Sequence, residues 1–139
     1  PNALENLVNE RYARYAKIQK EEQLAEEYLT QDAEVIVVAY GASSRVGRSA
    51  VNKAREQGIK AGLVRPITLW PFPVEAVKRA ATQAKNLLVV EMSMGQMVED
   101  VRLASECKVP VHFYGRTGGM IPTPNAVLAE IEKLVKGGE

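Results

Sequence analysis

The sequence predicts an α/β fold: a three-layer α/β/α domain built on an open, mostly parallel sheet, with a long helix in front of it. Two observations support this. Short apolar runs typical of buried strands alternate along the chain with amphipathic segments typical of helices. The run at residues 34–40 is rich in β-branched side chains and has no polar alternation, which is typical of a strand covered on both faces.

The first 28 residues predict a helix over Ala3–Tyr28, because apolar side chains recur at steps of three and four and no Gly or Pro interrupts them. Its apolar stripe is narrow and half aromatic, and consists of Leu4, Leu7, Val8, Tyr12 and Tyr15. Such a stripe fits docking on another subunit or domain as well as packing on the domain's own sheet. We therefore divide the chain into a docking helix or linker, 1–33, and an α/β domain, 34–139.

The α/β domain is expected to contain four strands and four helices. Ser43 or Ser44 is the expected cap of its first helix, and Gly58 is expected to end that helix in a left-handed conformation. Leu103 is placed among the apolar positions of a later helix, and Cys107 is expected to be a small buried apolar residue on a helix. The predicted strands are Glu34–Tyr40, Ala61–Arg65, Asn86–Glu91 and Val111–Tyr114; the later helices are Val74–Ala84, Gln96–Glu106 and Asn125–Val135, with a frayed tail over residues 136–139.

Composition limits the classes of function. A chain of 139 residues supports one domain with a hydrophobic core, and a net charge of +1 argues against nucleic-acid binding. No apolar run approaches the roughly 20 residues of a membrane span, and the first residues do not resemble a secretory signal, so we expect a cytoplasmic protein. The first residue is not methionine, which suggests a fragment or a processed product. One cysteine excludes an internal disulfide or a cysteine-held iron–sulfur cluster, and one histidine, His112, argues against a zinc site.

The segment Gly41–Gly47 is the first candidate site, because it joins a predicted strand to a helix. Open α/β sheets bind ligands at this position, and the N–H groups of a helix N-terminus attract anions. The residues that would act are Gly41, Ser43, Ser44 and Arg45. However, the spacing matches neither the dinucleotide-binding glycine pattern nor a phosphate-binding P-loop. A simple capped turn is therefore the favoured interpretation, with Arg45 in solvent or against a neighbour.

A second candidate is the glycine-rich loop Gly115–Gly119. Glycines there allow unusual backbone conformations and expose amide groups, and Arg116 can pair with a carboxylate or a phosphate. A contact loop for another subunit is favoured over a small-anion site. The residues concerned are Gly115, Arg116, Thr117, Gly118 and Gly119.

Three further features have a structural reading that we favour over a catalytic one. Glu91 ends a predicted strand without a partner for acid–base chemistry, so it or Ser93 is expected to cap the next helix. Trp70 in its proline-rich turn is expected to anchor a core or an interface. Met92, Met94 and Met97 suit a contact surface or a loosely packed core.

Several of these motifs, in this order, resemble a known family. The chain is similar to the C-terminal, transketolase-like domain of the α subunit of thiamine-diphosphate-dependent 2-oxoacid:ferredoxin oxidoreductases. The resemblance covers about residues 33–135. Its motifs are Tyr40-Gly41-Ala42-Ser43, Ala50 with Ala54 and Gly58, Arg65-Pro66, Leu69-Trp70-Pro71-Phe72-Pro73, Leu88-Val89-Val90-Glu91 with Gly95-Gln96, and Gly115–Gly119 with Pro122-Thr123-Pro124.

The resemblance implies a parent enzyme that oxidatively decarboxylates a 2-oxoacid to an acyl-coenzyme A and reduces ferredoxin, using thiamine diphosphate, Mg²⁺ and iron–sulfur clusters. The family's diphosphate and cysteine-cluster motifs are not present in this chain. The resemblance therefore implies a role in assembly, with no catalytic, cofactor-binding or metal-binding residue here and an isolated chain that is inactive. Other subunits or domains are the implied partners, ferredoxin and coenzyme A act through the parent, and pairing with a second copy stays open.

Two alternatives are kept. One is the C-terminal domain of another thiamine enzyme, such as a 2-oxoacid dehydrogenase β subunit or a transketolase. The other is a free-standing α/β domain that binds a nucleotide or phosphate at Gly41–Gly47.

Overall fold

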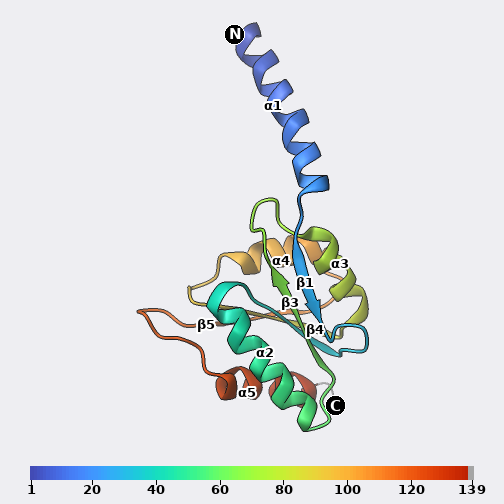
Figure 1. Ribbon diagram of the computed structural model, residues 1–139, viewed down its shortest axis with the longest axis vertical. Coiled ribbons are helices and arrows are strands. Elements are labelled where there is room, and N and C mark those ends of the chain that lie inside the picture. The colour runs from blue at the N-terminus through green and yellow to red at the C-terminus, as the bar shows by residue number, and fades with distance from the viewer. Residues whose placement is uncertain (138–139) are drawn as a thin grey trace.

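The computed structural model describes residues 1–137 as an α/β body from which one helix, α1, extends (Figure 1). A five-stranded sheet forms the middle of the body, and two helices cover each of its faces. The elements in chain order are α1 (Asn2–Glu21), β1 (Ala25–Tyr28), β2 (Val35–Val38), α2 (Gly41–Glu56), β3 (Ala61–Pro66), α3 (Val74–Gln83), β4 (Asn86–Glu91), α4 (Met97–Ser105), β5 (Val111–Gly115) and α5 (Pro124–Lys136).

The sheet has the strand order β1-β3-β2-β4-β5. Strands β2 to β5 are parallel, with Val35 opposite Ala61 on β3 and opposite Asn86 on β4. Helices α2 and α5 pack together on one face, and α3 and α4 pack together on the other. The predicted three-layer, mostly parallel architecture is confirmed.

The core lies on both faces of the central strands, which explains their continuous apolar runs. All four residues of β2 are buried. Gly47 allows α2 to lie close to the sheet, since a Cβ at this position would lie 3.2 Å from the Cγ1 of Val37. Gly58 follows α2 with φ of +81°, which confirms the predicted left-handed position.

The predicted helix over Ala3–Tyr28 is too long, because α1 ends at Glu21 and Ala25–Tyr28 forms strand β1. This strand pairs antiparallel with β3, with Glu26 opposite Arg65. Glu26 forms ion pairs with Arg48 and Arg65, and the Arg48 guanidinium lies 4.2 Å above the ring of Tyr28. The strand therefore depends on partners far along the chain, which local periodicity does not report. The domain division at residue 33 stays a prediction, although β1 places four residues of the first segment in the sheet.

Two predictions about α4 are wrong. Leu103 is 80% exposed on α4 rather than part of its apolar face. Cys107 is exposed and lies beyond the end of α4, where Glu106 and Cys107 both have positive φ values. The helix ends in a left-handed turn that carries the thiol away from the core. In the predicted tail, Lys136 still belongs to α5, Gly137 follows it, and residues 138–139 lie outside the described part of the chain.

No helix among the described residues is long and apolar enough to cross a membrane.

Candidate docking surface at the carboxyl edge of the sheet

The predicted site residues all lie at one edge of the sheet. Because β2, β3, β4 and β5 are parallel, the loops that follow them emerge at their common carboxyl edge. Strand β1 runs in the opposite direction, and its first residue, Ala25, lies opposite Pro66 at the end of β3. Helix α1 therefore joins the body at this same edge.

The segment after β2 is the first turn of a helix rather than a loop. Helix α2 begins at Gly41. Its N-cap residue is Tyr40, whose side chain makes no capping hydrogen bond. The predicted serine cap is therefore wrong. Ser43 and Ser44 are buried inside the first turn, and the Ser44 hydroxyl donates a hydrogen bond to the Gly41 carbonyl at 2.6 Å. Arg45 is exposed, and an anion-binding role for this turn stays a prediction.

The glycine-rich loop after β5 continues the edge of the sheet before it turns away. The Arg116 amide donates to the Glu91 carbonyl at 3.1 Å, which extends the pairing of β4 with β5 by one bond. Gly118 and Gly119 have φ of +64° and +77°, and a Cβ at either would have no atom within 4 Å. Among residues 1–137 the Arg116 guanidinium makes no ion pair. Whether it pairs with a subunit or with a small anion stays a prediction.

Glu91 caps the next helix, as expected. Its carboxylate is only 1% exposed, and it accepts hydrogen bonds from the amides of Gln96, Met97 and Val98 at 2.9 to 3.2 Å. The Ser93 hydroxyl donates a longer bond of 3.4 Å to the same carboxylate. The N-terminus of α4 is therefore filled by a negative charge from the chain itself and has no free amides for a phosphate.

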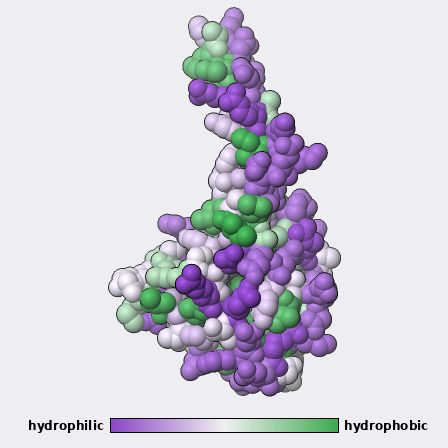
Figure 2. All heavy atoms as spheres, viewed as in Figure 1, coloured by the Kyte–Doolittle hydropathy of each residue, from purple (hydrophilic) through white to green (hydrophobic). Residues whose placement is uncertain are grey.

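Exposed apolar side chains surround this edge, and we call them the apolar edge. Met94 is 84% exposed and Trp70 is 57% exposed, whereas Met97 turns inward and is buried. Figure 2 shows apolar atoms gathered where α1 meets the body. The apolar edge consists of Leu24, Ile67, Leu69, Trp70, Met92, Met94, Met120 and Ile121. Sequence reasoning singled out Trp70 and two of the methionines as contact residues. It placed Leu24 inside a predicted helix, and the others lie in loops rich in Pro and Gly, where no periodicity marks a surface.

The apolar stripe of α1 continues this surface along the helix. No residue of α1 is buried, and Leu4, Leu7, Val8, Tyr12 and Tyr15 are all exposed. The rings of Tyr15 and Trp70 pack edge to face, with 5.7 Å between the ring centroids. Tyr12, Tyr15, Ala16, Gln19 and Trp70 line a groove of about 570 Å³. The stripe is thus open to solvent in this chain and joined to the apolar edge through Trp70.

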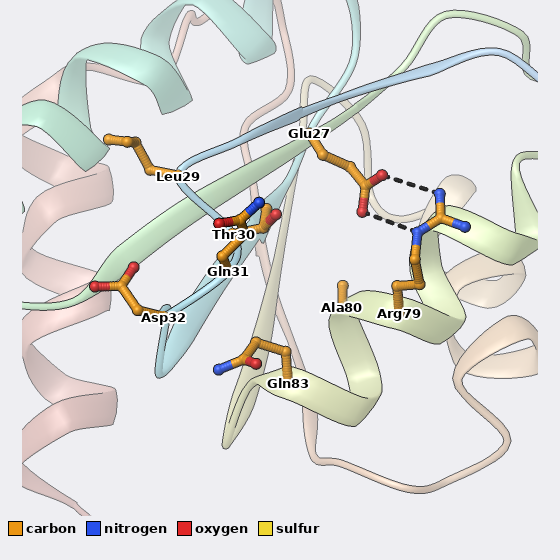
Figure 3. Close-up of a pocket in the computed structure, with 8 residues that line it drawn as sticks. All are labelled: Glu27, Leu29, Thr30, Gln31, Asp32, Arg79, Ala80 and Gln83. Carbon is orange, nitrogen blue, oxygen red and sulfur yellow. Dashed lines mark hydrogen bonds and ion pairs between the residues drawn. The ribbon is translucent and has the colours of Figure 1, made fainter.

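A polar depression of about 630 Å³ lies away from this surface, between α3 and the turn after β1 (Figure 3). The Arg79 guanidinium donates to both oxygens of Glu27, at 3.3 and 2.9 Å, and this pairing raises the pKa of Arg79. Asp32 at the other end pairs with Arg55 at 2.7 and 3.0 Å, which lowers the pKa of the Asp32 carboxyl. The charged groups of this depression therefore have partners already and offer no reactive site.

Cys107 and His112 belong to no candidate metal site in the part of the chain that the structure describes. The His112 ring nitrogen Nε2 lies 2.9 Å from the Asn86 side-chain oxygen, on the sheet and not among carboxylates. Within residues 1–137 no group of three or more His, Cys, Asp or Glu side chains is arranged to hold a metal ion.

This arrangement defines a class of protein, the transketolase C-terminal type of α/β domain. A solved split-gene transketolase, described as an inactive beta4 tetramer, superposes with a TM-score of 0.68 over 81% of this chain and 41% of that chain, at 20% identity. The 2-oxoglutarate:ferredoxin oxidoreductase of Magnetococcus marinus, solved with 2-oxoglutarate, coenzyme A and succinyl-CoA bound, gives a TM-score of 0.82 over 96% of this chain and 23% of that chain, at 22% identity. At these identities the likeness is one of fold.

Sequence comparison identifies the family. Residues 33–127 match the pyruvate:ferredoxin oxidoreductase core domain II, and the chain belongs to that family. It is 48% identical over 121 residues to the ketoisovalerate oxidoreductase subunit VorB of Methanothermobacter thermautotrophicus, covering 87% of this chain and 34% of that subunit. It is 41% identical over 109 residues to the 2-oxoglutarate synthase subunit KorA of the same organism, covering 78% and 29%. The suspected resemblance is confirmed, and the two alternatives are not favoured by the family match.

A third relative is the α subunit of the NADH-dependent phenylglyoxylate dehydrogenase of Aromatoleum evansii, at 40% identity over 82% of this chain and 30% of that subunit. The chain spans about a third of the length of the curated relatives it matches.

Proposed function

We propose that this chain is the assembly domain of the α subunit of a 2-oxoacid:ferredoxin oxidoreductase, and that it is not catalytic by itself. The parent reaction is the oxidative decarboxylation of a 2-oxoacid to an acyl-coenzyme A with reduction of ferredoxin. Family membership supports this proposal, as do relatives that are subunits of 2-oxoacid oxidoreductases. Those relatives are named for different 2-oxoacids, which supports placing the choice of substrate outside this chain.

The observation that carries the proposal is the apolar edge. Open α/β sheets hold small ligands at their carboxyl edge with backbone amides and polar side chains. In this chain that edge instead presents eight exposed large apolar side chains, and the amides of the α4 N-terminus are already bonded to Glu91. An apolar surface of this kind fits protein contact better than a charged ligand. Other subunits or domains of the oxidoreductase are the proposed partners.

We further propose that the cofactors of the parent are held elsewhere. A diphosphate needs free amides or cations with room around them, and the α4 N-terminus does not fit it because Glu91 occupies its N–H groups. An iron–sulfur cluster needs about four cysteines, and the sequence has one. The family's diphosphate motif is also absent from this sequence. We therefore place thiamine diphosphate, Mg²⁺ and the clusters in other parts of the parent, through which ferredoxin and coenzyme A act in the cytoplasm.

The proposal is tested by purifying the affinity-tagged chain from its source cells. The expected result is co-purification with polypeptides whose sequences, read by mass spectrometry, are those of a 2-oxoacid oxidoreductase. Met94→Glu, which places a charge on the apolar edge, is expected to reduce this co-purification. Val135→Glu is the matched control, because Val135 is exposed near the end of α5, which runs back toward the opposite edge. A tagged chain that purifies alone would overturn the proposal.

The cofactor assignment is tested by calorimetry of the isolated chain with thiamine diphosphate and Mg²⁺. No binding heat is expected. A dissociation constant in the micromolar range would place the cofactor on this chain and contradict the assembly role.

A further inference from the structure

Helix α1 needs a partner that the rest of this chain does not supply. It has 20 residues, none of them buried. It meets the body near its carboxyl end, where the Tyr15 ring contacts Trp70. Two residues beyond the helix make further contacts: the Gln23 side chain accepts from the Glu75 amide at 3.2 Å, and Leu24 bonds to Thr68. Isolated helices are marginal in water, and most helices in proteins depend on burial of one face. A stripe of five large apolar side chains is therefore expected to be covered in the working protein.

A single cation interrupts this stripe. Positions 4, 7, 8, 11 and 15 share one face of a helix, because 3.6 residues make one turn. Arg11 is thus in line with Leu4, Leu7 and Tyr15. Among the described residues no carboxylate pairs with Arg11; the nearby Glu10 pairs with Arg14 at 3.7 Å. A guanidinium covered by a docking surface without a carboxylate opposite it is costly.

Arg11 distinguishes between a second copy of α1 and a different surface as the cover of the stripe. Two copies of α1 packed in parallel would place each residue against itself, so Arg11 would face Arg11. Packed antiparallel with their stripes in register, they would again bring the two Arg11 residues close together, because Arg11 lies near the middle of the stripe. Like charges facing each other destabilise an interface. A second copy of this chain is therefore a poor occupant, and an apolar surface that carries a carboxylate is a good one.

The same fold also occurs within a longer polypeptide. The superposition on the Magnetococcus oxidoreductase covers 96% of this chain, so most of α1 is included, and it covers only 23% of that chain. Helix α1 extends away from the body (Figure 1), and the other protein of this fold has a large further part beyond the region that matches.

We propose that α1 docks through its stripe on an apolar surface elsewhere in the 2-oxoacid oxidoreductase, and that Arg11 determines the specificity of this contact by pairing with a carboxylate there. The inference rests on the proposed function. Beyond that function, α1 supplies the contacting face, the partner surface carries a negative charge, and Arg11 disfavours pairing of α1 with a second copy of itself.

The first test compares Arg11→Glu with Lys17→Glu in the tagged chain purified from its source cells. Both variants make the same change of charge on an exposed residue of α1, but Lys17 lies on the other side of the helix from the stripe. Arg11→Glu is expected to weaken retention of the oxidoreductase polypeptides at least about tenfold, whereas Lys17→Glu retains them. Circular dichroism of both variants checks that the fold is intact. Equal retention by both variants would overturn this inference and leave the proposed function standing.

The second test uses Arg11→Lys and a carbodiimide, which joins an ammonium group to a carboxylate without a spacer. The expected product links position 11 to an Asp or Glu of an oxidoreductase polypeptide outside this chain. A link to a second copy of this chain, or no link at position 11 in an intact complex, would overturn the inference. A tagged chain that purifies alone would instead overturn the proposed function, and this inference with it.

Discussion

Replacing the buried carboxylate of Glu91 tests whether this residue holds the body together. In Glu91→Gln one oxygen becomes an NH₂ group, which faces backbone N–H groups that cannot accept a hydrogen bond from it. Oε1 accepts from Gln96 and Met97, and Oε2 accepts from Gln96 and Val98. The substitution therefore removes the hydrogen bonds to one oxygen. It also weakens the hydrogen bonds to the other oxygen, because that oxygen then belongs to a neutral amide and not to a charged carboxylate.

The magnitude follows from these contacts. Hydrogen bonds to charged groups contribute about 1.5–3 kcal/mol each, and a negative charge at a helix N-terminus adds about 0.3–2 kcal/mol. Because the amide retains part of this network, we expect the free energy of unfolding to fall by about 2–4 kcal/mol. Of a typical total of about 5–15 kcal/mol this is a large share, and it lowers the Tm by roughly 10 °C.

Urea unfolding followed by circular dichroism measures this change, and the denaturant slope should stay that of the wild type. Glu99→Gln is the matched control on the same helix, because Glu99 is exposed and pairs with Arg102 at 2.8 Å. It should change the free energy of unfolding by less than about 1 kcal/mol. A Glu91→Gln protein as stable as the control would refute the capping role, and would reopen the acid–base role for Glu91.

Three further predictions follow from the same edge of the sheet and from α4. Arg116→Ala should weaken assembly with the oxidoreductase, which size exclusion of the reconstituted complex measures. The free energy of unfolding should stay within about 0.5 kcal/mol of the wild type, because Arg116 makes no ion pair within residues 1–137. An intact complex without 2-oxoacid turnover would instead place Arg116 in the active site. Gly115→Ala should lower stability by about 1–3 kcal/mol, since its Cβ would overlap the Ser93 carbonyl, and an unchanged melting curve would contradict that crowding. Asp100 is exposed on α4, and its partial desolvation, followed by the charge of Glu91, raises the pKa of its carboxyl, so its charged form is less stable in the folded state. Stability then falls as pH rises from about 3.9 through the raised value, and Asp100→Asn should stabilise the protein at pH 7 but not below about pH 3.9; a gain that is the same at both pH values would refute the assignment.

The chain's own amino acids were enough to predict the order of the α/β elements. The predicted bounds of strand Asn86–Glu91 are those of the structure, and the predicted bounds of the other parallel strands differ from the observed ones by at most two residues. Strand and helix periods are local properties, and a strand buried on both faces shows a continuous apolar run that needs no knowledge of its neighbours. The capping role of Glu91 was predictable for the same reason, because the residue and the helix it caps lie within a few positions of each other.

The structure decided what depends on distant partners. Ala25–Tyr28 reads as part of a helix, yet it is a strand, because β3 and the cations of Arg48 and Arg65 lie beside it only in the folded chain. Leu103, by contrast, is exposed for a reason that the sequence itself contains: it lies about 200° around α4 from the buried Val101, because each residue turns the helix by about 100°. The apolar edge likewise exists only after folding, because parallel strands bring the ends of separate loops to one side of the sheet. Local order is encoded in short-range spacing, whereas surfaces are made by residues far apart in the chain, and tertiary packing alone determines which of them meet.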